Sequence, residues 1–241
     1  APKVEKQIIS FKNGLAELPQ LLVAALGESV HANVSISSIQ KIGAGWRVDW
    51  NGKINIYDEV LLTTPTHALD KLPFDESLQK ALQPLLTIDY SPVSVLTVAF
   101  KRSDVAQPLD GFGMLVPECE GRKILGVLFP ASLFANRAPA GEVLLTVFVG
   151  GERQTELAVP DKDTLLATVL PELNELFGTT GEPTFSHHRH WPRAIPQYNL
   201  GYGKVLAQMD AIEKRFTGLK LAGNYRDGIS LSYCIEAAVS K

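Results

Sequence analysis

Residues 219–238 read LKLAGNYRDGISLSYCIEAA, and they combine a short apolar strand, a turn bounded by glycines and the start of a helix. The turn runs from Gly223 to Gly228, and glycine lets the backbone approach a ligand closely. The N–H groups of the first helical turn favour an anion or a carbonyl oxygen. Because strand-to-helix turns with glycine are common in α/β proteins, a purely structural connection is the alternative for this stretch.

The segments nearest the start of the chain follow a different pattern. Apolar and polar residues alternate over 30–60, which is typical of strands with one buried face. Asn51-Gly52 interrupts the alternation, and this pair is a strong signal for a tight hairpin. We therefore predict a small antiparallel meander, preceded by a helix over 13–26 and followed by a short buried strand over 58–65.

The middle of the chain holds longer β-rich runs separated by glycine and proline. The runs predicted to form a broader antiparallel sheet are 93–100, 114–116, 123–129 and 143–149. A helix is expected over 161–177, with Asp161 at its N-cap and Gly178 at its end. Beyond it we predict, in order, a strand over 183–191, a proline-rich turn, a helix over 204–216, a strand over 219–222 and a last helix from Ile229. Because strands and helices mix without regular alternation, the expected fold class is α+β (mixed α/β) and not a plain doubly wound sheet.

Composition limits the classes of partner. The chain has 241 residues, with 23 Lys and Arg against 26 Asp and Glu, so its formal net charge is −3. Without a basic patch, nucleic acid is not an expected partner. The longest apolar runs fall far short of the roughly 20 residues that cross a bilayer, and we expect neither a membrane span nor a secretory signal. Two cysteines fit a reducing compartment, so a cytoplasmic location is expected.

Residues that carry metal or covalent chemistry are sparse. His187, His188 and His190 are neighbours, but alternation along a strand would divide them between two faces. No cysteine or carboxylate stands at a spacing that would complete a metal site. Cys119 lies between two acidic residues, which oppose formation of a thiolate. We therefore expect no metal, and the residues by themselves leave the catalytic groups unknown.

Several phrases together resemble one enzyme family. WPRAIPQYNLGY at 191–202 is followed by LAGNYRDG at 221–228 and by Cys234-Ile235. The upstream phrases that fit the same family in the same order are FKNGLAELP (11–19), LTTPTHA (62–68), GFGMLVP (111–117), ILGVLF (124–129), NRAPAG (136–141) and FVGG (148–151). The chain resembles the C-terminal portion of the oxygen-dependent, FAD-containing protoporphyrinogen oxidases of the flavin amine oxidase superfamily.

The resemblance implies a split FAD-binding domain with an inserted substrate domain built on an antiparallel sheet. On that template, 1–88 and 191–241 are C-terminal parts of the FAD-binding domain, and 89–190 is the substrate-binding domain. It implies that FAD contacts Ile36, Trp191, Gly228, Ile229, Ser230 and Leu231. It also implies that the porphyrinogen meets Gly113, Met114, Leu115 and Phe129, with packing inside the sheet as the alternative for Phe129.

The implied reaction is the oxidation of protoporphyrinogen IX or coproporphyrinogen III to the porphyrin, in haem biosynthesis. Hydride would pass from the macrocycle to FAD, and oxygen would reoxidise the flavin. The sequence contains no G-x-G-x-x-G fingerprint for the FAD pyrophosphate. We therefore expect that segment of the family to lie upstream of Ala1, and we expect the chain alone to bind FAD weakly and to be inactive. Peripheral membrane contact is expected only through that segment, and the sequence leaves homo-oligomer formation open.

Two other functions stay open from the sequence. A related flavin amine oxidase or carotenoid desaturase would share the domain plan, although the Ile-Pro-Gln-Tyr phrase at 195–198 favours the porphyrinogen enzyme. The chain would otherwise be a non-catalytic fragment that binds a tetrapyrrole.

Overall fold

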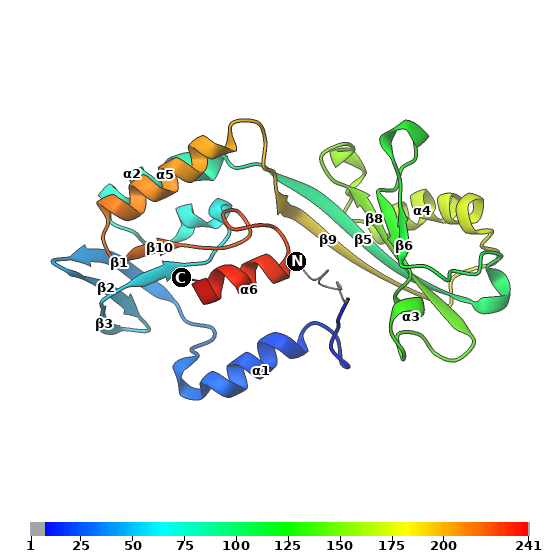
Figure 1. The fold of residues 1–241 in the computed structure, drawn as a ribbon, viewed down its shortest axis with the longest axis horizontal. Helices are drawn as coiled ribbons and strands as arrows, with labels where there is room; N and C mark the ends of the chain where they lie inside the picture. Colours follow the sequence, from blue (N-terminus) through cyan, green and yellow to red (C-terminus); the bar gives the residue numbers. More distant parts are fainter. Residues whose placement is uncertain (1–7, 241) are drawn as a thin grey trace, which may run out of the picture.

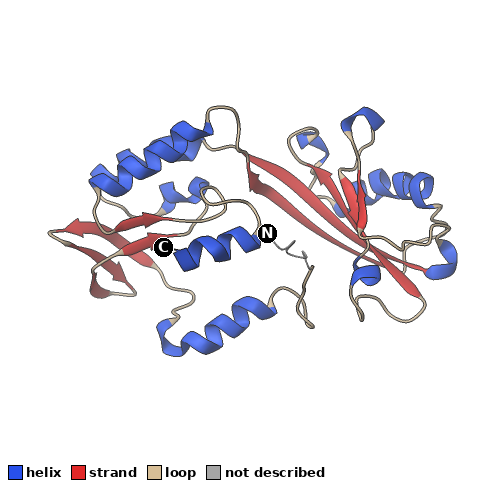
Figure 2. Ribbon diagram, in the orientation of Figure 1, coloured by secondary structure: helices blue, strands red, loops and turns tan. Residues whose placement is uncertain are grey.

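The structure is a computed structural model that describes residues 8–240. The described chain forms two lobes joined by two long paired strands, β5 (Tyr90–Lys101) and β9 (Phe185–Pro196) (Figure 1). Each lobe has its own apolar core. The first core is built mainly from segments that precede β5 and follow β9, and the second core is built from β5 and the segments between the two strands. Figure 2 shows that both lobes combine helices and strands.

The first lobe contains the predicted meander, which is confirmed as a three-stranded antiparallel sheet of β1 (Ile36–Ile42), β2 (Gly45–Trp50) and β3 (Lys53–Tyr57). Asn51 and Gly52 connect β2 to β3 with φ values of 48° and 75°. Positive φ at both central residues is what a type I′ hairpin turn requires. Trp46 of β2 is fully buried, and its Nε1–H donates to the carbonyl oxygen of Thr217 at 3.2 Å. The meander is thereby attached to a segment that lies far along the chain.

A two-stranded parallel sheet lies beside the meander. It pairs β4 (Val60–Leu62) with β10 (Leu219–Leu221), so one segment that precedes β5 and one that follows β9 build a single sheet. Helices α2 (Glu76–Leu82) and α5 (Tyr202–Arg215) place side chains in the same core as both strands. The first lobe therefore needs segments from both sides of the second lobe.

The second lobe is a five-stranded antiparallel sheet with the strand order β6-β7-β8-β5-β9. The strands not yet named are β6 (Gly113–Leu115), β7 (Gly126–Leu128) and β8 (Glu142–Gly150), and the short helix α3 (Pro130–Leu133) follows β7. Helix α4 (Lys162–Phe177) packs on one face of the sheet. Its residues Leu165, Val169 and Leu173 are fully buried and recur at helical spacing. The predicted helix and its ends are confirmed, since Asp161 Oδ2 accepts the N–H of Thr164 at 2.7 Å and Gly178 ends α4.

The predicted strand over 183–191 followed by a proline-rich turn is wrong in extent. β9 continues to Pro196 and contains Pro192 within the strand. β9 is the last strand of its sheet and pairs only with β5. The backbone N–H groups on its outer side have no partner strand, so proline, which lacks an N–H, is tolerated there. A register shift between Ser91 and Val93 of β5 accommodates the prolines.

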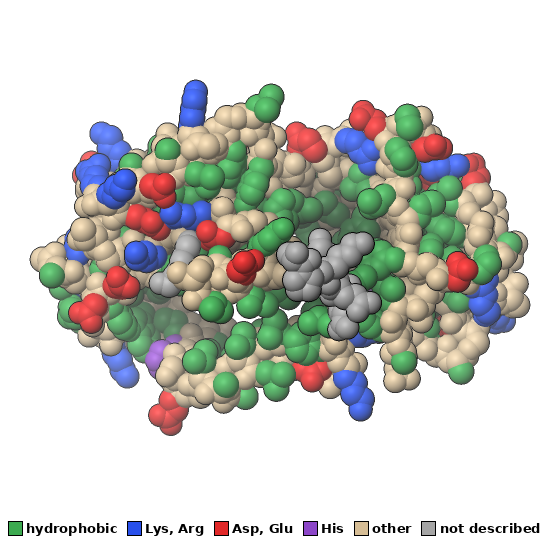
Figure 3. All heavy atoms as spheres, viewed as in Figure 1, with side chains coloured by type: hydrophobic (Ala, Val, Ile, Leu, Met, Phe, Trp, Pro, Cys, Tyr) green, Lys and Arg blue, Asp and Glu red, His purple; other side chains and the backbone are tan. Residues whose placement is uncertain are grey.

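Helices α1 (Glu17–Leu26) and α6 (Leu231–Ser240) bury none of their residues. Their exposed apolar side chains are Leu21, Leu22, Val23 and Leu26 on α1 and Leu231, Tyr233, Ile235 and Val239 on α6. Figure 3 shows the hydrophobic side chains gathered over α1. An apolar surface of this kind is typical of a face that another segment or partner covers. No helix within 8–240 has both the length and the apolar character needed to cross a membrane.

We expect Asp161→Ala to destabilise the protein at neutral pH, because alanine cannot accept the N–H of Thr164. The hydrogen bonds from Thr164 hold the pKa of Asp161 below its usual value. A pKa that is lower in the folded state means that the carboxylate stabilises the fold above its ordinary pKa and loses this effect as the pH falls through the lowered value. The gap in urea midpoint between the two proteins should therefore be present at pH 7 and should close in acid.

Asp163→Ala is the matched control, because Asp163 lies in the same first turn but makes no side-chain hydrogen bond within the described chain. An equal loss in the Asp163 variant, or a gap that persists in acid, would contradict the role of Asp161 as a cap.

Candidate functional site

The loop over 222–230 carries β10 into α6. Gly228 has a φ of 116°, and a Cβ atom added there would lie 2.8 to 2.9 Å from side-chain atoms of Tyr233. Only glycine fits this position without a shift of Tyr233. Ser230 Oγ accepts the N–H of Tyr233 at 3.2 Å and caps the helix. Other N–H groups of a first helical turn lack partners inside the helix, so they remain available to a carbonyl or phosphate oxygen.

Tyr198 fixes this loop to the end of β9. Its hydroxyl accepts the N–H of Gly228 at 3.1 Å and donates to the carbonyl oxygen of Asn224 at 2.6 Å. Tyr198 belongs to the phrase at 191–202, whereas Asn224 and Gly228 belong to the phrase at 221–228. The two most specific phrases of the sequence therefore meet in one hydrogen-bonded unit.

Two further tyrosines support Tyr198. The ring of Tyr198 stacks on Tyr202 with the ring centroids 4.5 Å apart, and the Tyr202 hydroxyl donates to the carbonyl oxygen of Tyr225. Tyr225 is fully buried, and its hydroxyl donates to the carbonyl oxygen of Leu62 at 3.3 Å. Burial raises the pKa of all three hydroxyls, so they act as neutral donors at neutral pH.

The predicted flavin contacts fall in two places. Trp191 lies in β9, is 45% exposed and has the Arg189 guanidinium carbon 4.6 Å from its ring centroid. The loop at 228–231 is tied to the end of the same strand through Tyr198. Ile36 is instead the first residue of β1, where it pairs with Trp50 in the meander. The structure therefore joins Trp191 to the loop through one strand and places Ile36 on a separate element.

The five-stranded sheet has one face covered by α4 and one face that we call the open face. Strand register defines the open face by rows that cross the sheet. One row is Leu115, Gly126, Phe148, Val95 and Arg189, and the next is Gly113, Leu128, Thr146, Thr97 and His187. The side chains of Leu115, Leu128 and Phe148 are exposed or partly exposed. The open face is thus a mainly apolar surface with a cationic residue on its β9 edge.

The structure separates the four predicted substrate contacts. Gly113 and Leu115 lie on the open face, as does Trp191. Met114 lies in the intervening row and packs against the core under α4. Phe129 is 7% exposed and meets Phe177 of α4 edge to face, with the ring centroids 5.5 Å apart. Phe129 is therefore a core residue on the helix side, as the packing alternative describes, and Met114 is partly buried against the same core.

Sequence reasoning missed Leu128 and Phe148, which the structure places on the open face. The signal was present as alternation, because Leu128 is one residue before Phe129 and must point to the opposite face. The runs over 123–129 and 143–149 are apolar on both faces, however, so the sequence does not show which face the helix covers.

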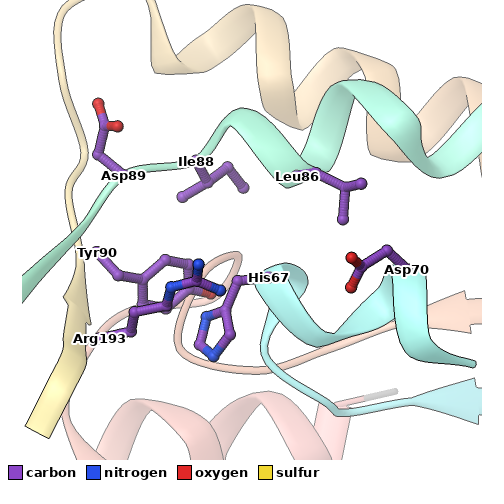
Figure 4. Close-up of a pocket in the computed structure, with 7 residues that line it drawn as sticks. All are labelled: His67, Asp70, Leu86, Ile88, Asp89, Tyr90 and Arg193. Atoms are coloured by element: carbon purple, nitrogen blue, oxygen red, sulfur yellow. The ribbon is translucent and has the colours of Figure 1, made fainter.

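A polar cavity of about 320 Å³ lies where β5 and β9 enter the first lobe. It is lined by His67, Asp70, Leu86, Ile88, Asp89, Tyr90 and Arg193 (Figure 4). The imidazole of His67 lies edge to face on Tyr90, with the ring centroids 4.7 Å apart. Burial, followed by the charges of Arg193 and Lys71, lowers the pKa of His67, so this ring is neutral at neutral pH. None of these residues was singled out from the sequence.

The described residues contain no group of three or more His, Cys, Asp or Glu side chains that could hold a metal ion. The histidines of β9 are divided between faces, as alternation predicts. His188 Nε2 and His190 Nδ1 each lie 3.2 Å from Ser94 Oγ on the α4 side, while His187 lies in a row of the open face.

Comparison with known proteins identifies the family. Residues 3–240 match the family model described as flavin containing amine oxidoreductase. The chain belongs to this family. Among its relatives, the mitochondrial protoporphyrinogen oxidase of Nicotiana tabacum is 39% identical over 75% of this chain and 37% of that protein. The coproporphyrinogen III oxidase of Staphylococcus aureus is 25% identical over 98% of this chain and 50% of that protein.

A solved structure shows the same fold. A protein of Exiguobacterium sp. that is described as a candidate protoporphyrinogen oxidase superposes with a TM-score of 0.78 at 23% identity. The match covers 96% of this chain and 50% of that protein. The predicted mixed α+β class is therefore confirmed. The chain spans half or less of the length of the relatives reported above.

We expect Tyr198→Phe to loosen the loop at 228, because the Gly228 N–H and the Asn224 carbonyl lose their shared partner. Two net hydrogen bonds correspond to a loss of about 1 to 2 kcal/mol in stability. Amide hydrogen exchange should become faster at Gly228 and stay unchanged in α4.

Tyr57→Phe is the matched control, because Tyr57 is also an exposed tyrosine but lies on β3 of the meander. Unchanged exchange at Gly228 in the Tyr198 variant would show that this hydroxyl does not hold the loop.

Proposed function

We propose that this chain is part of an FAD-dependent oxidase that converts a porphyrinogen to the porphyrin with oxygen as electron acceptor. The observation that carries the proposal is the open face, a broad apolar surface that includes Trp191 of β9, with Tyr198 just beyond the same strand holding the loop at 228–231. A flat macrocycle buries a large apolar area on such a surface. The relatives named as protoporphyrinogen and coproporphyrinogen oxidases support this substrate class.

The two separate cores support an assignment of the chain to two domains with different binding roles. We propose that 1–88 and 191–241 belong to the FAD-binding domain and that 89–190 binds the substrate. The first core draws only on the two outer segments and on the first residue of β5, and the second core lies within 96–177. β9 crosses the boundary at 191, so it carries residues of both proposed sites.

The proposed flavin contacts are Trp191 and the backbone of Gly228, Ile229, Ser230 and Leu231, with Ile36 toward the adenine end. The residues present fit a flavin. The turn at Gly228 leads directly into α6, and the start of α6 offers N–H donors to a ring carbonyl. When bound, FAD supplies the hydride acceptor, and the protein orients substrate and flavin.

The proposed substrate contacts are Gly113, Leu115, Leu128 and Phe148. We leave out Met114 and Phe129 because their side chains lie on the α4 side of the sheet. Leu115, Leu128 and Phe148 exclude water from one side of the macrocycle. The hydroxyls of Thr97 and Thr146 lie in the same rows and can accept hydrogen bonds from pyrrole N–H groups. No titratable side chain lies in the centre of these rows, so the residues serve to bind and orient the substrate.

We also propose that the rest of the protein covers α1, α6 and the edges of the β4–β10 sheet. A parallel sheet is normally buried on both faces and contains more than two strands. Leu61 of β4 is 54% exposed, and a cavity of about 310 Å³ lies between β4, β10 and α6. Relatives that are about twice as long as this chain support an additional segment of the same protein as the partner.

Phe148→Ala in the protein that contains this chain should raise KM for protoporphyrinogen or coproporphyrinogen by about ten- to hundredfold, because a large aromatic contact is worth about 1.5 to 3 kcal/mol. Anaerobic reduction of the bound flavin by each porphyrinogen, followed by reoxidation with oxygen, measures the activity. Reduction by amines or carotenes, but not by porphyrinogens, would overturn the proposed substrate class.

The matched control is Tyr57→Ala, because Tyr57 is an exposed aromatic residue on β3 of the meander, outside the open face. Its KM should change by less than about twofold, since surface substitutions away from a site have small effects. Equal effects of the two variants would remove the open face from the binding site.

We expect the 241-residue chain purified alone to bind FAD weakly and to be inactive, because its sequence has no pyrophosphate-binding fingerprint. Flavin absorbance after gel filtration measures the bound cofactor. Stoichiometric yellow flavin in the isolated chain would contradict this expectation.

A further inference from the structure

The polar cavity at the junction of the lobes contains cationic and neutral donors without partners. The side chain of Arg193 is exposed and makes no hydrogen bond or ion pair within the described chain. Nδ1 of His67 is buried and has no hydrogen-bond partner. A buried polar atom without a partner is costly in a folded protein unless a ligand or water satisfies it. The cavity therefore has unused binding capacity on one wall.

Two carboxylates, those of Asp70 and Asp89, also line the cavity and affect the electrostatic potential near His67. Asp70 stabilises the charged form of His67, but this effect is smaller than the opposing effects of Arg193 and Lys71. Asp89 lies beyond Arg193 in Figure 4, with its carboxylate directed away from His67, and it accepts the Asn199 amide at 3.4 Å. Arg193 is the one cationic side chain among the residues that line the cavity, and it makes no ion pair within the described chain, so an anion can bind beside Arg193 and His67.

The cavity begins where the open face ends. Arg193 is two residues beyond Trp191 on β9. Tyr90 is the first residue of β5, the strand that pairs with both β8 and β9. The apolar side chains of the open face lie on β6, β7 and β8, whereas the cationic residues Arg189 and Arg193 lie on β9. A ligand that spans both regions needs an apolar body and an acidic edge.

We propose that Arg193 and His67 bind a carboxylate on the edge of the tetrapyrrole and thereby set the orientation of the macrocycle on the open face. The proposal rests on the function proposed above. Porphyrinogens carry propionate side chains at their edge, and the guanidinium of Arg193 matches a carboxylate in geometry and charge. The N–H of His67 supplies a second donor, and Tyr90 holds its ring. Arg193 and His67 are therefore specificity-determining residues of the substrate site.

The test compares two stable porphyrins that differ only in their acidic edge, protoporphyrin IX and its dimethyl ester. Each is titrated into the chain, and quenching of tryptophan fluorescence reports binding, since Trp191 lies on the open face two residues before Arg193. We expect the diacid to bind about tenfold more tightly than the diester, the factor expected of a charge-assisted hydrogen bond. Arg193→Gln should abolish most of this difference and leave the diester affinity unchanged.

His67→Phe is the second variant, because it keeps the edge-to-face contact with Tyr90 and removes only the ring nitrogens. It should reduce the preference for the diacid without altering the urea midpoint. Arg215→Gln is the matched control, because it removes one arginine whose guanidinium contacts Ser77 at 3.0 Å on α2, outside the cavity. It should keep the full preference for the diacid.

Equal affinity for the diacid and the diester, or a preference that survives in both the Arg193 and His67 variants, would overturn the carboxylate site and leave the proposed function standing. Absence of saturable quenching with either porphyrin would count against the open face as a tetrapyrrole surface, and the carboxylate site would fall with it.

Discussion

The antiparallel pairing of β5 with β9 is the constraint on which the remaining architecture depends. Each strand is 12 residues long, and together they run out of one core and into the other. Their pairing fixes the register that brings Trp191 opposite Val93 and Arg189 opposite Val95. Because β9 is an edge strand, it also tolerates the prolines that carry the chain back into the first lobe. The proposed flavin-binding and substrate-binding parts of the molecule therefore share the hydrogen-bonded pair of strands β5 and β9.

Local signals predicted the elements whose geometry is decided by a few neighbouring residues. Asn51-Gly52, Asp161 and Gly178 each determine a turn or a helix end through their own backbone or side-chain chemistry, and each stands where the sequence placed it. Faces of a sheet are decided by what packs on them, which is not a local property. Phe129 and Phe148 are both aromatic residues in apolar runs, and only the position of α4 makes the first a core residue and the second a surface one.

The resemblance to a family depended on two phrases whose connection is visible only in three dimensions. Tyr198 binds the loop that contains Gly228, so a change in either phrase alters the other. Sequence reasoning could not predict the cavity lined by His67 and Arg193 for the same reason, because its residues come from three separate segments that no spacing rule connects.

The interleaving of the two cores has a consequence for the order of folding. The second core lies within 96–177, a continuous stretch whose contacts close over short loops. The first core cannot be completed until β10, at 219–221, pairs with β4 across the whole second lobe. Long loops close slowly, and they close faster when the intervening chain is already compact. During synthesis on the ribosome, the second lobe can therefore be the first to become resistant to proteases, while β4 stays unpaired until β10 has emerged.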